Sequence, residues 1–184
     1  MEKIWIPEHY ESSNLYQFES FVSKKYNLCF TEYNELHKWS ITNLDKFWES
    51  ISEFYKIEFD NNYDYVLRKE TPFYKTKWFS GAVLSYSKHI LRYAKNNKIA
   101  IKYKNEFDDI VEISWNSLFE KTKEIRDILV KCSVNKGDVV VGYLLNHPDT
   151  IASFIAANSL GAVWSCCSPD FGVESIINRF SQLN

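Results

Sequence analysis

Two apolar runs in the carboxyl-terminal third of the chain, residues 139–145 and 162–167, constrain its fold most. Each has the length of a β-strand and lacks polar alternation, which is typical of strands covered on both faces. Between them, Pro148 suits the first turn of a helix that runs to residue 160, and Gly161 suits a left-handed stop. We therefore predict a βαβ unit, with two neighbouring parallel strands and a right-handed crossover.

The residues before this unit also predict strands and helices. Residues 99–103 alternate as a short half-buried strand, and residues 111–113 suit its hairpin partner. Ser114 or its neighbour is expected to cap a helix that ends near Gly137, and residues 173–182 form a last amphipathic helix. One hairpin and two parallel strands leave a sheet edge open, so the predicted class is α/β with an incomplete sheet.

The first half of the chain is predicted to be helical and irregular. Residues 15–26 form a helix with Leu15, Phe18, Val22 and Tyr26 facing inward. Residues 44–55 carry a stronger apolar stripe, preceded by a Thr42/Asp45 pair that resembles a capping box. Residues 60–74 show no clear periodicity.

Charge and hydropathy exclude several classes of function. The 184 residues include 22 basic and 24 acidic side chains, well mixed along the chain, which is no footprint for nucleic acid or an anionic membrane. No apolar run approaches the roughly 18 residues that span a bilayer, and the amino terminus lacks an apolar leader region. We therefore expect a cytoplasmic protein; its oligomeric state is left open.

Cysteine and histidine spacing does not predict a metal site. Cys29, Cys132, Cys166 and Cys167 do not pair as metal-ligand knuckles, and we expect them to be reduced and buried. The histidines are also isolated, without the spacing that holds zinc.

Each of the two predicted parallel strands is followed by a turn. The first, residues 144–149 (LLNHPD), has no glycine, which disfavours a dinucleotide-binding site, and no Walker sequence occurs in the chain. His147 beside Asp149 is expected to cap a helix or lie on the surface rather than catalyse. In the second turn, Ser168 lacks a nucleophile elbow, and Asp170 is available to cap the next helix. This second turn nevertheless lies on the side where open α/β sheets bind ligands.

The second turn belongs to a resemblance that extends over much of the chain. Residues 164–172, WSCCSPDFG, resemble the WS-x-C-SPDFG segment of acetoacetyl-CoA synthetases. Residues 136–140 (KGDVV), 146–149 (NHPD) and 159–164 (SLGAVW) are similar to patterns of the wider acyl-CoA synthetase class. Residues 36–40 (LHKWS) and 78–84 (WFSGAVL) resemble the amino-terminal cap of acetyl-CoA synthetases and its joint with the large domain. Residues 85–89, SYSKH, depart from the family's N-Y-A-E-N, and Cys166 replaces a small residue.

The resemblance implies the amino-terminal part of an adenylate-forming ligase. Residues 1–92 would be the helical cap and residues 93–184 the first part of the AMP-binding domain. The complete enzyme would use ATP, CoA and Mg²⁺ to convert acetoacetate, a short-chain keto acid, into acetoacetyl-CoA through an acyl-adenylate. The family's catalytic motifs lie outside this chain, which is expected to be inactive alone. Only a CoA adenosine contact falls within it, at Ser168, Pro169 and Asp170.

Three alternatives accompany this hypothesis. In the first, the chain belongs to an acetyl-CoA or other short-chain acyl-CoA synthetase, which activity only with acetate or a longer acid would indicate. In the second, it is a non-catalytic remnant that associates with another chain through its sheet edge, which a stop codon after residue 184 would support. In the third, it is a free-standing CoA-binding module, which requires measurable affinity for CoA.

Overall fold

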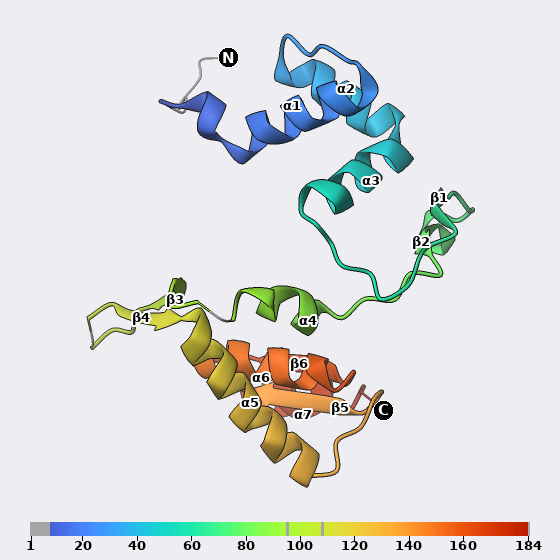
Figure 1. Ribbon diagram of the computed structural model, residues 1–184. Helices are drawn as coiled ribbons and strands as arrows, with labels where there is room; N and C mark the ends of the chain where they lie inside the picture. Colours follow the sequence, from blue (N-terminus) through green and yellow to red (C-terminus); the bar gives the residue numbers. More distant parts are fainter. Residues whose placement is uncertain (1–7, 95, 108, 184) are drawn as a thin grey trace. The chain divides into compact units, whose positions relative to one another are not determined.

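The computed structural model describes residues 8–94, 96–107 and 109–183. The chain forms two compact units, residues 1–83 and 84–184 (Figure 1). Residues 84–92, which the sequence assigns to the cap, pack with the second unit through α4 and η3. The domain boundary at residue 92 stays a prediction.

The first unit begins with helices. They are η1 (Tyr10–Ser12), α1 (Asn14–Tyr26), α2 (Tyr33–Thr42) and α3 (Leu44–Phe54). The Ser13 side chain caps α1 by accepting a hydrogen bond from the Tyr16 amide. Phe18 and Val22 are buried as predicted, whereas Leu15 is 39% exposed, so its predicted inward position is wrong. This unit therefore contains the predicted first helix with a narrower buried face.

Helix α3 confirms the helix predicted over residues 44–55 but not its capping pair. Thr42 ends α2, and its hydroxyl donates to the Lys38 carbonyl at 2.8 Å. The α3 N-cap residue is Asn43, without a side-chain cap, and Asp45 is exposed in the first turn. The predicted Thr42/Asp45 box is wrong because the preceding helix already uses the threonine hydroxyl.

The most buried side chains of α3 are two serines rather than the apolar stripe. Ser50 and Ser52 are 0% and 7% exposed, whereas Trp48 is 41% exposed. The two hydroxyls donate to the carbonyls of Lys46 and Glu49 at 2.7 and 2.8 Å. Because buried hydroxyls need hydrogen-bond partners, these backbone bonds let the small serines lie at the contact surface.

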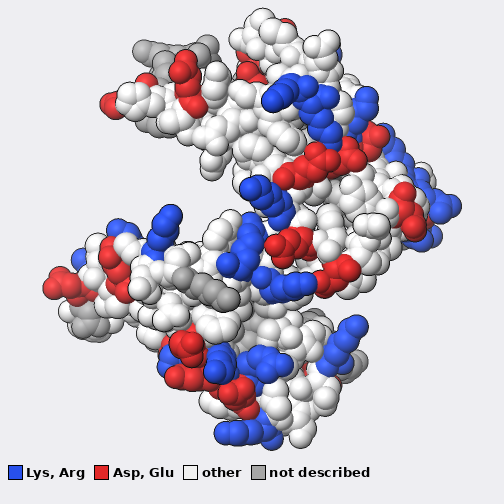
Figure 2. Space-filling model, in the orientation of Figure 1, with Lys and Arg blue, Asp and Glu red and all other residues white. Residues whose placement is uncertain are grey.

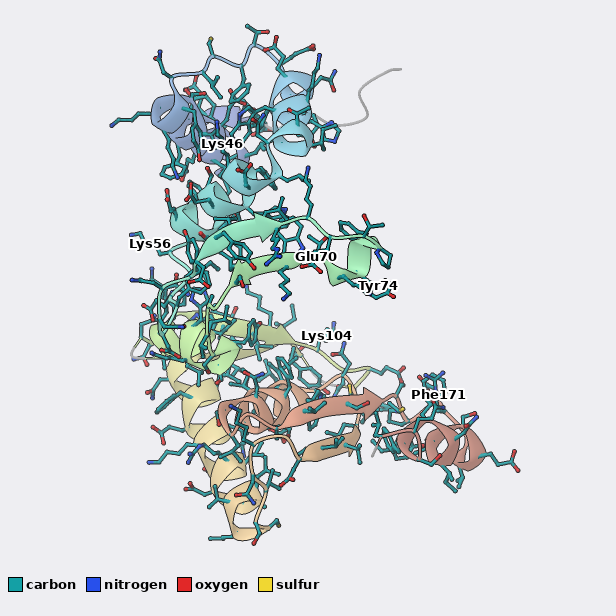
Figure 3. All side chains as sticks on the ribbon, turned by 90° about the vertical axis from the view of Figure 1, so that its right-hand side faces the viewer. Lys46, Lys56, Glu70, Tyr74, Lys104 and Phe171 are labelled. Atoms are coloured by element: carbon teal, nitrogen blue, oxygen red, sulfur yellow. The ribbon has the colours of Figure 1, made fainter. Side chains whose placement is uncertain are left out.

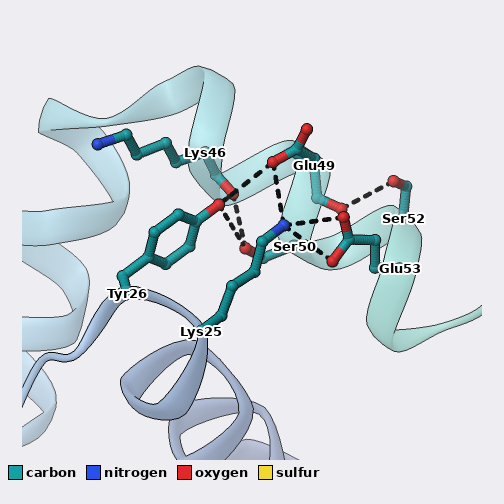
Figure 4. Close-up of polar contacts among 7 residues, drawn as sticks. All are labelled: Lys25, Tyr26, Lys46, Glu49, Ser50, Ser52 and Glu53. Carbon is teal, nitrogen blue, oxygen red and sulfur yellow. Dashed lines mark hydrogen bonds and ion pairs between the residues drawn. The ribbon is translucent and has the colours of Figure 1, made fainter.

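An ion-pair cluster joins the end of α1 to α3 (Figure 4). The Lys25 ammonium lies 3.0 Å from the Glu49 carboxylate and 2.8 Å from that of Glu53. The Tyr26 hydroxyl donates to the same Glu49 oxygen at 3.3 Å. Burial alone would lower the pKa of Lys25, but the hydrogen bonds to Glu53 and Glu49 outweigh it and raise that pKa. The cluster therefore favours the charged lysine.

Replacing Lys25 by Met is expected to lower the free energy of unfolding by less than about 1 kcal/mol, because this pair is partly exposed. The loss should shrink in about 1 M salt, which screens exposed charges. Since the folded-state pKa is raised, the stabilisation is complete below the ordinary value of about 10.4 and is lost as pH rises through the raised pKa. Urea unfolding at about pH 7 and pH 9 should give equal losses.

Lys24→Met is the matched control, because Lys24 occupies the same last turn of α1 and is exposed. It should change the free energy of unfolding by no more than about 0.5 kcal/mol. An equal loss for both variants, or a Lys25→Met loss that salt does not reduce, would show that the cluster does not stabilise the unit.

The rest of the first unit contains a hairpin that the sequence did not predict. Strand β1 (Tyr65–Arg68) pairs antiparallel with β2 (Lys77–Ser80), and η2 (Phe73–Lys75) lies in the connection. The prediction of an irregular segment over residues 60–74 is therefore wrong for β1. Four-residue strands are too short to establish a visible alternation.

The second unit begins with short elements and a predicted hairpin. After α4 (Tyr86–Ile90) and η3 (Leu91–Tyr93), β3 (Ile99–Tyr103) pairs antiparallel with β4 (Val111–Ser114). The Ser114 side chain accepts a hydrogen bond from the Ser117 amide at 3.1 Å and caps α5 (Trp115–Lys131). Both the hairpin and the capping serine are confirmed.

The predicted βαβ unit is also confirmed. Strand β5 (Val139–Tyr143), helix α6 (Pro148–Ser159) and strand β6 (Val163–Cys167) follow one another. The two strands pair in parallel, from Val139 opposite Val163 to Tyr143 opposite Cys167. Gly161 has a φ of +72°, the left-handed conformation expected at the helix stop. The last helix is α7 (Val173–Phe180).

The core of the second unit lies where α5 and α6 pack side by side (Figure 1). Leu118 of α5 contacts Ala152 and Ile155 of α6, and all three are at most 3% exposed. Ala156 and Ala157 are fully buried on the same helix. These small side chains let α6 pack closely against its neighbours.

Strand β5 and helix α7 are more exposed than predicted. Val141 and Tyr143 of β5 are 46% and 49% exposed, so complete cover on both faces is not observed. Val173 and Ile177 on the apolar face of α7 are 71% and 62% exposed. The sheet that the described residues form here has two strands, which leaves these faces without cover.

The four cysteines are free, but the prediction that they are buried is wrong for three of them. Cys29, Cys132 and Cys166 are exposed, and Cys167 is buried. Cys132 lies at the carboxyl-terminal cap of α5. Cys166 and Cys167 are successive strand residues, whose side chains point to opposite faces.

Charge is distributed as the sequence indicates. On the face drawn in Figure 2, basic and acidic side chains lie interspersed. In the part of the chain that the structure describes, no helix is both long and apolar enough to cross a bilayer.

Candidate functional site

The structure places Ser168, Pro169 and Asp170 together in the turn between β6 and α7. The Ser168 hydroxyl donates to the Asp170 carboxylate at 2.7 Å, and the Phe171 amide donates to the Ser168 carbonyl at 3.2 Å. Both polar side chains are exposed. The turn follows the carboxyl end of a parallel strand, on the ligand-binding side of an open α/β sheet.

Asp170 does not have the capping role predicted for it. The N-cap residue of α7 is Gly172, and no side chain caps this helix. The Asp170 carboxylate instead accepts the Ser168 hydroxyl, which holds it within the turn.

Tyr143, at the end of β5, holds the backbone of this turn. Its hydroxyl donates to the Pro169 carbonyl at 2.8 Å and to the Phe171 carbonyl at 3.3 Å. The Leu144 amide also donates to the Cys167 carbonyl at 3.2 Å. The two strand ends and the turn are thus joined by hydrogen bonds, while the side chains of Ser168 and Asp170 stay accessible.

Phe171 and Arg179 form a second contact beside the turn. The Arg179 guanidinium carbon lies 4.4 Å from the centroid of the Phe171 ring, a cation–π contact between the turn and α7. Figure 3 labels Phe171 in the segment that precedes α7. The contact places a positive charge near the exposed turn.

His147 has the capping role that the sequence favoured. It is the N-cap residue of α6, and its Nδ1 accepts a hydrogen bond from the Asp149 amide at 3.2 Å. The ring also meets Tyr103 edge-on, with centroids 4.9 Å apart. These contacts account for the histidine without catalysis.

The polar side chains of the turn are one hydroxyl and one carboxylate, those of Ser168 and Asp170. Within residues 8–94, 96–107 and 109–183, no three His, Cys, Asp or Glu side chains gather as a metal site. With the Ser168 hydroxyl proton donated to Asp170, the exposed oxygens of both side chains are left as hydrogen-bond acceptors. The turn itself carries no cationic side chain for a phosphate.

Sequence reasoning missed Tyr143 and Arg179 as residues of this region. In the sequence, Tyr143 is one member of an apolar strand, and its hydroxyl bonds to residues 169 and 171 depend on strand register. A tyrosine at the carboxyl end of a predicted parallel strand is the sequence feature that could have suggested such a tether. Arg179 has no such indication, because its contact with Phe171 depends on how α7 folds back.

The chain is similar to acetoacetyl-CoA synthetases and, over part of its length, to the amino-terminal segment of acetyl-coenzyme A synthetases. Residues 33–90 match the family model described as the acetyl-coenzyme A synthetase N-terminus. Acetoacetyl-CoA synthetases from Macaca fascicularis and Mus musculus are each 32% identical over 182 residues, 98% of this chain. The chain spans about a quarter of the length of these relatives, 27%.

A solved structure gives the same relation in three dimensions. Acetoacetyl-CoA synthetase from Streptomyces lividans matches 94% of this chain and 27% of its own, with a TM-score of 0.87 and 30% identity. The fold is therefore that of the N-terminal part of an adenylate-forming enzyme. Within that class, the resemblance to acetoacetyl-CoA synthetases is confirmed over nearly the whole chain.

Proposed function

We propose that this chain serves as the amino-terminal part of an acetoacetate–CoA ligase, an acid–thiol ligase. The observation that carries the proposal is the match to the Streptomyces lividans acetoacetyl-CoA synthetase, at a TM-score of 0.87 over 94% of the chain. Residues 1–92 form the cap and residues 93–184 the first part of the AMP-binding domain. The protein acts in the cytoplasm.

The complete reaction has two steps. A carboxylate oxygen of acetoacetate attacks the α-phosphorus of ATP, which releases pyrophosphate and leaves an acyl-adenylate. The CoA thiol then attacks the acyl carbon, loses its proton and displaces AMP. Mg²⁺ supplies charge stabilisation at the phosphates. The residues of this chain contribute binding and positioning, and the chain alone is inactive.

The contribution we assign to this chain is contact with the adenosine of CoA. Ser168 and Asp170 offer a hydroxyl and a carboxylate in an exposed turn, and Tyr143 fixes the backbone of that turn. A turn held in its binding conformation loses less entropy on binding than a mobile one. Pro169 restricts the backbone further.

The product of the whole reading frame tests the ligase proposal. We expect AMP formation that depends on both acetoacetate and CoA, and none from residues 1–184 alone. Activity only with acetate or a longer acid would move the substrate assignment to another acyl-CoA synthetase. A folded product that forms no AMP with any of these acids would contradict the ligase.

The CoA contact is tested by Ser168→Ala and Asp170→Asn in the same active product. Each should raise KM for CoA about tenfold, the effect of about 1.4 kcal/mol of lost hydrogen bonding, with KM for acetoacetate unchanged. Ser181→Ala is the control, because Ser181 is an exposed serine at the far end of α7. Equal values for all three variants would remove the turn from the CoA site.

A further inference from the structure

A polar pocket lies between β6 and α7, beside the turn but lined by other side chains. Its volume is about 490 Å³. Polar groups line it from the strand and the helix, together with both cysteines of β6; they are Ser165, Ser175, Asn178, Arg179 and Gln182. Among the described residues, no carboxylate side chain lines this pocket. Among the described residues that line the pocket, Arg179 is therefore the one with a formal charge.

The Arg179 guanidinium is positioned but not neutralised. The Phe171 ring covers one of its faces, with 4.4 Å from the guanidinium carbon to the ring centroid. In the part of the chain that the structure describes, no carboxylate lies within 4.0 Å of it. A guanidinium stays charged at every accessible pH and carries five N–H donors at the edge of its plane. Stacking on the ring leaves that edge available to a ligand.

The neighbouring groups add neutral donors. The Ser165 and Ser175 hydroxyls come from opposite walls of the pocket, and Asn178 contributes an amide. Gln182 donates to the Asn178 carbonyl at 2.8 Å, which ties the last turn of this wall together. An arginine with hydroxyl and amide donors, and without a competing carboxylate, matches the acceptor oxygens of a phosphate group.

We propose that this pocket binds a phosphate group, with Arg179 as its charged ligand. The proposal does not require the CoA contact at the turn to be correct. The pocket would recognise phosphate oxygens, which inorganic phosphate and the 3′-phosphate of CoA both carry. The two sources are separable by experiment, since dephospho-CoA lacks the 3′-phosphate.

The test is a titration of the 184-residue chain with sodium phosphate at constant ionic strength. The amide resonances of Ser175, Asn178 and Gln182 should shift and saturate. Arg179→Gln should weaken binding about tenfold or more, the range for a lost hydrogen bond to a charged group. Arg126→Gln, at an exposed arginine of α5, should bind like the parent. Circular dichroism should show that both variants fold.

Parallel titrations with CoA and dephospho-CoA identify the source of the phosphate. Tighter binding of CoA than of dephospho-CoA, lost in Arg179→Gln, assigns the pocket to the 3′-phosphate. Saturable binding of inorganic phosphate without that preference assigns it to a free anion. No saturable response to any of the three ligands, or the same affinity in Arg179→Gln and Arg126→Gln, overturns the proposal. Ser168→Ala should leave the phosphate affinity unchanged, which keeps this outcome separate from that of the CoA contact.

Discussion

Leu118→Ala is expected to lower the free energy of unfolding of the second unit by about 3 kcal/mol, within the usual range of about 2–5 kcal/mol for such truncations. Leu118 is 3% exposed and contacts Ala152 and Ile155 where α5 meets α6. The loss combines the transfer free energy of the removed methyl groups with the cost of a cavity that alanine neighbours cannot fill. Urea unfolding followed by far-ultraviolet circular dichroism measures it.

Ile128→Ala on the same helix is the control for this prediction. Ile128 is 57% exposed, so its truncation should change stability by no more than about 0.5 kcal/mol. If Leu118→Ala and Ile128→Ala unfolded at the same urea concentration, the contact between α5 and α6 would not be the core of the unit.

Gly142→Val is expected to cost about 2 kcal/mol, because overpacking a filled site typically costs about 1–3 kcal/mol. Gly142 is the buried next-to-last residue of β5. A Cβ atom there would lie 2.8 and 3.0 Å from two carbons of the Trp164 ring, and 3.1 Å from a methyl carbon of Leu144. The indole of β6 occupies the space of a side chain on β5, so the strand pair must shift to admit one.

Gly172→Ala separates this steric effect from the loss of a glycine. A Cβ atom at Gly172 meets no atom within 4 Å, and its φ of −65° suits any residue. The alanine should change the urea midpoint by less than the equivalent of about 0.5 kcal/mol. A cooperative transition of Gly142→Val at the parental midpoint would contradict the described packing of Trp164.

The second unit was predicted better than the first because its local sequence and its long-range contacts agree. Pro148, Gly161 and two apolar runs of strand length specify a helix between parallel strands, and Ser114 marks the start of α5. In the first unit, β1 and β2 have four residues each and depend on pairing across a connection. A pattern within one segment cannot reveal that pairing.

Burial was predicted less well than element type. Periodicity identified the apolar faces of α3 and α7, yet Ser50 is fully buried and Ile177 is 62% exposed. Which face is covered depends on the neighbouring element and not on the helix itself. The candidate site shows the same division. Its place after a predicted strand and the family resemblance singled out the turn, whose ligand role stays a prediction, whereas the contacts of Tyr143 and Arg179 required the folded chain.

The hydrogen bond from the Tyr143 hydroxyl to the Pro169 carbonyl connects the turn to a strand residue 26 positions earlier in the chain. A bound molecule that displaced the turn would strain this hydrogen bond and displace the end of β5. A shift of β5 would likewise displace the turn. The positions of the turn and of the carboxyl end of β5 therefore depend on each other.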